Sequence, residues 1–90
     1  MTSGEWRLVV SPAARRNLEQ LPEKALFAVL DTLEAIGVNP LRLGRALHFE
    51  LANHFSARRG PHRVVYRLGE RERTVLVVAI GHRSDVYRPR

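Results

Sequence analysis

The sequence has no cysteine and only one lysine, and both shortages narrow what the chain can be. Without cysteine it forms no disulfide and no thiolate metal site, which fits a cytoplasmic protein. No apolar run approaches the roughly 18 residues that span a bilayer. The opening residues, MTSGEWRLVV, lack the pattern of a signal peptide. We therefore expect a soluble domain in the cytoplasm, without contact to a membrane.

Positive charge is abundant by contrast. Fifteen Lys and Arg against nine Asp and Glu give a net charge of +6, and all of these cations except Lys24 are arginines. A GC-rich genome accounts for much of the preference for arginine over lysine, but it does not account for the net charge. An electropositive domain of this size suits phosphates or an acidic protein. Arginine in particular holds phosphate through two parallel hydrogen bonds.

Length and periodicity predict one domain, residues 1–90, with a thin core. Pro and Gly punctuation together with apolar spacing predicts the order β-α-α-β-β-β. The fold class is therefore α+β, an antiparallel-rich four-stranded sheet with a two-helix hairpin packed on one face. We expect function on the other face. The predicted elements are a strand at 5–11, helices at 12–21 and 22–37, an ordered loop at 38–46, and strands at 53–60, 62–69 and 73–81.

A cluster of cations follows from pairing the strands 53–60 and 62–69. In such a hairpin Arg58 lies opposite Arg63, and their side chains share a face. Like charges directly opposite each other cost up to about 1 kcal/mol, which is tolerable where an anion binds between them. Pairing of each arginine with a nearby carboxylate is the alternative. The residues expected to contact nucleic acid here are Arg58, Arg59, His54 and Arg67.

The segment GHRSDVYR supplies further chemistry near the same region. His82 can accept or donate a proton. Arg83 can neutralise a phosphate, and Tyr87 can stack on a base or ionise in a cationic setting. With Arg63, these groups are sufficient to cleave RNA by attack of the ribose 2′-OH, because arginines offset the charge that grows on phosphate. The alternative for Tyr87 is that it only anchors the tail.

Metal and cofactor sites are not predicted. No glycine-rich phosphate loop is present, and the serines have no partners for a catalytic triad. The histidines lack the spacing of a metal site and have no supporting cysteines or paired carboxylates. They are His48, His54, His62 and His82.

The stretch SARRGPHRVVYRLGERERTVLVVAIGHRSDVYR, preceded by SPAARRNLEQLPEK and NPLRLGRAL, resembles the RelE/ParE toxin superfamily of bacterial type II toxin–antitoxin systems, on the RelE side. The resemblance covers nearly the whole chain and implies the same β-α-α-β-β-β fold. It implies a toxin that enters the ribosomal A site and cleaves the codon there without metal. It also implies neutralisation by a RelB-like antitoxin, through which the toxin reaches promoter DNA indirectly.

Carried over residue by residue, the resemblance assigns Arg63 and Arg83 to transition-state charge and Tyr87 to positioning or proton abstraction. Arg58 matches a basic position on the preceding strand. Where RelE toxins often carry two lysines, this sequence has His54 and Ser56 instead. His82 is then a candidate for the proton transfer, so the acid and base assignments stay open.

Two other function classes stay open as well. One is a ParE-like poison of DNA gyrase without ribonuclease activity. Members of that branch generally lack the full set of Arg63, Arg83 and Tyr87, which weighs against it. The other is a nucleic-acid-binding domain without catalysis, for which the net charge would suffice.

Overall fold

The structure is a computed structural model that describes residues 6–46 and 54–82. In this part of the chain, helices pack on one face of a single sheet. The elements in chain order are β1 (Arg7–Val10), α1 (Pro12–Glu19), α2 (Glu23–Val38), α3 (Pro40–Leu43), β2 (Arg45–Ala46), β3 (His54–Arg59), β4 (His62–Gly69) and β5 (Thr74–His82).

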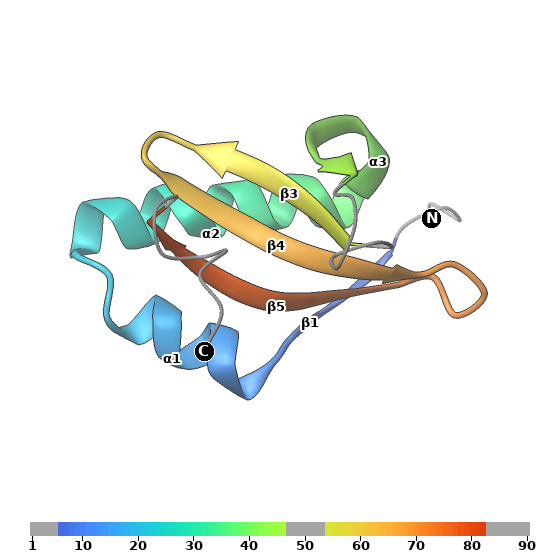
Figure 1. Ribbon diagram of the computed structural model, residues 1–90, viewed down its shortest axis with the longest axis horizontal. Helices are drawn as coiled ribbons and strands as arrows, with labels where there is room; N and C mark the ends of the chain where they lie inside the picture. Colours follow the sequence, from blue (N-terminus) through green and yellow to red (C-terminus); the bar gives the residue numbers. More distant parts are fainter. Residues whose placement is uncertain (1–5, 47–53, 83–90) are drawn as a thin grey trace.

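The strand order is β1-β5-β4-β3-β2. β1 runs parallel to β5, and the remaining neighbours are antiparallel. In Figure 1, α2 passes behind β3 and β4, so the viewer looks onto the face of the sheet that no described helix covers. We call this face the helix-free face. The predicted α+β fold with a helix pair on one side is confirmed. In the described residues the sheet has five strands rather than the predicted four, because β2 pairs with β3. None of the helices in the described ranges is long and apolar enough to cross a membrane.

The prediction of an ordered loop at 38–46 is wrong, because this stretch forms α3 and β2. The side chain of Asn39 accepts a hydrogen bond from the backbone N–H of Leu41, and Pro40 occupies the first helical position. Both are standard helix-start features. α2 also continues one residue past Gly37, which was expected to end it.

The helices are fixed to the sheet by side-chain hydrogen bonds as well as by apolar packing. Ser11 caps α1 by accepting from the backbone N–H of Ala14 at 3.1 Å. Asn17, on the same helix, accepts from the backbone N–H of Ile80 at 3.0 Å. The buried core lies between the layers and comprises Ala14, Val29, Leu33, Ile36, Ala57, Val64, Tyr66, Val75, Val77 and Ile80.

Tyr66 ties the sheet to the segment that follows α2. Its side chain is fully buried, and its hydroxyl donates to the carbonyl oxygen of Pro40 at 2.5 Å. Burial raises the pKa of Tyr66 to about 12, although a hydrogen bond with the Gly44 backbone opposes the shift. The contact joins residues that are 26 positions apart, and it holds α3 against β4.

The raised pKa predicts a specific loss of stability in alkali. The unfolded chain releases the Tyr66 proton near pH 10, and the folded chain only near pH 12. The stabilisation is therefore complete below pH 10 and is lost as the pH rises towards 12, by about 2–3 kcal/mol in total. Urea unfolding between pH 8 and 12 should show this fall. Tyr66→Phe, which cannot ionise, should flatten the curve; an equally steep fall in this variant would contradict the assignment.

Candidate nucleic-acid interface

The pairing of β3 with β4 brings the predicted cations together. Arg58 lies directly opposite Arg63, and His54 lies opposite Arg67. Alternation along the two strands then places all four side chains on the helix-free face. The predicted register is confirmed, and with it the shared face of Arg58 and Arg63.

The residues that lie between these charged side chains on the helix-free face are buried. Ser56 and Val65, which pair with each other between the two charged pairs, are 6% and 3% exposed. Arg58 is exposed, whereas Arg63 is half-buried. The two arginines thus occupy neighbouring positions on one face of adjacent strands, and an anion that bridged their side chains would offset the repulsion of like charges. A phosphodiester fits this chemistry because each guanidinium can hold two of its oxygens.

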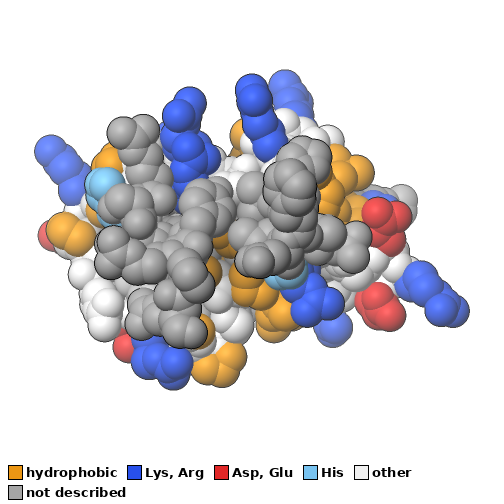
Figure 2. All heavy atoms as spheres, viewed as in Figure 1, with side chains coloured by type: hydrophobic (Ala, Val, Ile, Leu, Met, Phe, Trp, Pro, Cys, Tyr) orange, Lys and Arg blue, Asp and Glu red, His pale blue; other side chains and the backbone are white. Residues whose placement is uncertain are grey.

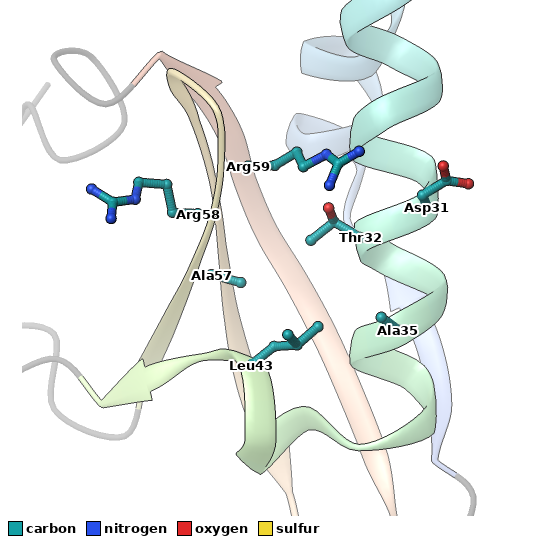
Figure 3. Close-up of a pocket in the computed structure, with 7 residues that line it drawn as sticks. All are labelled: Asp31, Thr32, Ala35, Leu43, Ala57, Arg58 and Arg59. Atoms are coloured by element: carbon teal, nitrogen blue, oxygen red, sulfur yellow. The ribbon is translucent and has the colours of Figure 1, made fainter.

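Two other predicted residues lie on the opposite side of the sheet. Figure 3 shows Arg59 directed towards α2, whereas Arg58 points away from that helix. His82 pairs with His62 and follows Ile80 at spacing two, so alternation places it on the side of the core. The structure therefore does not bring Arg59 and His82 together with the Arg58–Arg63 pair. Their roles remain predictions.

The two histidines at this end of the sheet contact each other. The ring centroids of His62 and His82 are 6.3 Å apart, and the rings meet edge to face at 75°. His82 is exposed, and His62 is half-buried. Sequence reasoning did not foresee this contact, although it follows from the register of β4 and β5. Arg83 and Tyr87, the remaining predicted catalytic residues, lie outside the described residues.

Further cations lie at the margin of the molecule. Figure 2 shows Lys and Arg side chains projecting around the margin of the molecule in the view onto the helix-free face. Within residues 6–46 and 54–82, no group of three or more His, Cys, Asp or Glu side chains is placed to hold a metal ion.

A hollow of about 200 Å³ was not predicted from the sequence. It lies between α2, α3 and the end of β3 (Figure 3), and we call it the edge groove. The sequence feature that could have indicated this hollow is the Asn39–Pro40 pair. It starts a helix that the prediction of a loop overlooked. The edge groove is lined by Asp31, Thr32, Ala35, Leu43, Ala57, Arg58 and Arg59.

Comparison with known proteins identifies toxins of toxin–antitoxin systems as relatives of this chain. The family model for the ParE toxin of the type II toxin-antitoxin system parDE matches residues 8–87. The chain is 43% identical to Toxin RelG of Mycobacterium tuberculosis over 83% of its length and 87% of that protein. It is 36% identical to Toxin RelE of the same organism, over 92% and 87%. A chain of the crystal structure of the M. tuberculosis toxin–antitoxin complex RelBE2 superposes with a TM-score of 0.82 at 38% identity, covering 90% of this chain and 94% of the other.

Proposed function

From the premise that this chain belongs to the RelE/ParE superfamily and is a type II toxin of the RelE family, we propose that it cleaves messenger RNA on the ribosome. The observation that carries the proposal is the placement of Arg58 opposite Arg63 on the helix-free face. Two arginine side chains at neighbouring positions on one face of the sheet suit a phosphodiester whose charge increases during reaction.

The proposed reaction is an internal transesterification in the codon held in the ribosomal A site. The ribose 2′-oxygen forms a bond to the neighbouring phosphorus as its proton passes to a base, and the bond from phosphorus to the 5′-oxygen breaks. That leaving oxygen takes a proton. Arg63 and Arg58 offset the negative charge on the phosphoryl oxygens, so the step requires no metal ion.

The proton transfers of this reaction are not assigned to single residues. Tyr87 and Arg83 are proposed to act at the same phosphate, in the roles that the RelE resemblance gives them. Of the two candidate histidines, His54 shares the helix-free face with Arg63, whereas His82 lies on the side of the core. This placement favours His54 for contact with RNA. A role for His82 in proton transfer depends on the course of the chain after β5.

The partners follow from the same premise. We propose that a RelB-like antitoxin neutralises the toxin in the cytoplasm and carries the complex to promoter DNA. A relative of known structure was determined as part of a toxin–antitoxin complex, which supports such a partner. The net charge of +6 fits both ribosomal RNA and an acidic antitoxin.

A second candidate is inhibition of DNA gyrase, since the matching family model is that of the ParE toxin. The two activities separate in a pair of assays with the same purified protein. Cell-free translation of a reporter should stop, whereas supercoiling of relaxed plasmid by gyrase should continue unchanged. Inhibited supercoiling with normal translation would contradict the ribonuclease proposal and would establish the gyrase alternative.

A further inference from the structure

Two histidines meet where the pairing of β4 with β5 ends, far from the turn that joins the two strands. His62 lies directly opposite His82, and their ring centroids are 6.3 Å apart. Directly opposite residues of antiparallel strands have Cβ atoms about 4.5–5.5 Å apart, so both side chains can reach one point. The two residues are distant in the sequence, and only the register of the strands brings them together.

The distance between the two rings suits a shared metal ion. An imidazole nitrogen lies about 2.0–2.1 Å from a bound zinc ion, so two imidazoles on one ion have ring centroids about 5–6 Å apart. The observed 6.3 Å is close to this range. The side chain of His82 is exposed and has room to turn towards His62. A small change of side-chain torsions is therefore sufficient to place both rings on one ion.

The backbone that carries the two rings is held by its neighbours. Arg63 pairs with Gly81, and Val64 with Ile80, directly beside the histidines. The backbone N–H of Ile80 also donates to the side-chain oxygen of Asn17 on α1, at 3.0 Å. Ligands on a backbone that is already ordered lose less conformational freedom on binding than ligands on a mobile loop. The pair is thus arranged before an ion arrives.

The donor atoms and their surroundings decide which ions suit the pair. Mg²⁺ and Ca²⁺ take oxygen ligands, whereas this pair offers only nitrogen. Zn²⁺, Ni²⁺ and Cu²⁺ are well suited to imidazole, and Cu²⁺ is generally held most tightly of the three. Within residues 6–46 and 54–82, no carboxylate joins the two histidines as a third ligand. Arg59 pairs with His62 from the other side, but its side chain extends towards α2 (Figure 3).

We propose that His62 and His82 form a binding site for one divalent transition-metal ion, with water completing the coordination. The bound ion joins β4 to the last residue of β5 and so stabilises the folded chain. Its affinity is modest, because zinc sites of the structural and catalytic kinds use three or four protein ligands. A metal ion and a proton compete for the same ring nitrogen. An occupied site therefore withdraws that nitrogen of His82 from proton transfer.

Titration of the chain, free of any affinity tag, with Zn²⁺ tests the site through the NMR signals of the imidazole rings. We expect the signals of His62 and His82 to shift together and to saturate at one ion for the pair. The signals of His54, which lies opposite Arg67, should stay in place. Mg²⁺ at the same concentration should shift none of them. A response of His54 alone, or no response of the pair to Zn²⁺, would overturn the proposal.

Single substitutions distinguish joint binding from binding at separate histidines. His82→Ala removes one ligand from an exposed position and should weaken the Zn²⁺ response of His62 by about tenfold or more, because even groups that only support a ligand are worth about 10–100-fold in metal affinity. His54→Ala is the matched control and should leave that response unchanged. Equal effects of the two variants would overturn the proposal. The titration contains no ribosome or RNA, so its result does not depend on the proposed function.

Discussion

Replacing Arg63 with alanine is expected to slow ribosome-dependent mRNA cleavage by about 10²–10³-fold, the usual cost of removing one group that stabilises developing charge. Arg63 lies opposite Arg58 and is half-buried beside the buried residues Ser56 and Val65, so its side chain is more confined than that of an exposed arginine. Single-turnover cleavage at saturating ribosomes measures the chemical step directly.

Arg71→Ala is the matched control for this experiment. It removes the same charge from an exposed residue in the turn between β4 and β5, away from the interface. We expect cleavage at saturating ribosomes to stay within about twofold of wild type, since a distant surface charge mainly affects association rather than chemistry. Equal losses in the two variants would show that Arg63 contributes only net charge. That result would remove it from the proposed mechanism.

Gly44→Ala is expected to destabilise the fold by about 2–4 kcal/mol. A Cβ at this position would lie 2.0 Å from the hydroxyl oxygen of Tyr66 and 2.8 Å from its ring carbon Cζ. The Tyr66 side chain is fully buried and bonded to Pro40, so it cannot move aside without breaking that hydrogen bond. Urea denaturation followed by circular dichroism gives the change in the free energy of unfolding.

The same substitution at Gly37 is expected to have the opposite effect on stability. A Cβ at Gly37 would meet nothing within 4 Å, and the residue lies inside α2. Alanine should therefore stabilise the helix, by up to about 1 kcal/mol. Wild-type stability of Gly44→Ala would mean that Tyr66 does not pack against the segment between α3 and β2, and the account of how α3 is held would then be wrong.

Local patterns predicted the part of the site that depends on strand period and hairpin register. The alternation in β3 and β4 and the turn at Gly60 were sufficient to place Arg58 opposite Arg63. The same alternation places His82 and Arg63 on opposite faces of the sheet. Arg63 pairs with Gly81, and His82 is the next residue along β5. Arg83 and Tyr87 lie beyond the described part of the chain, so their assignment still depends on the family resemblance.

Features that depend on distant contacts were not predictable in the same way. Gly44 lies so close to Tyr66 that there is no room for a Cβ, and no pattern within residues 38–46 encodes this contact. The bulge between β4 and β5 likewise depends on tertiary context. Val65 pairs with Ala79 and Tyr66 with Val77, and the carbonyl of the unpaired Val78 accepts from Ser11.

The measurement that tests the central claim most directly is primer extension on a defined mRNA in a cell-free translation system. We predict new 5′ ends within codons when ribosomes and the wild-type chain are both present. The ends should be absent without ribosomes and strongly reduced with Arg63→Ala. An intact message in a reaction whose translation the chain still stops, or equal cutting of the RNA without ribosomes, would contradict the account.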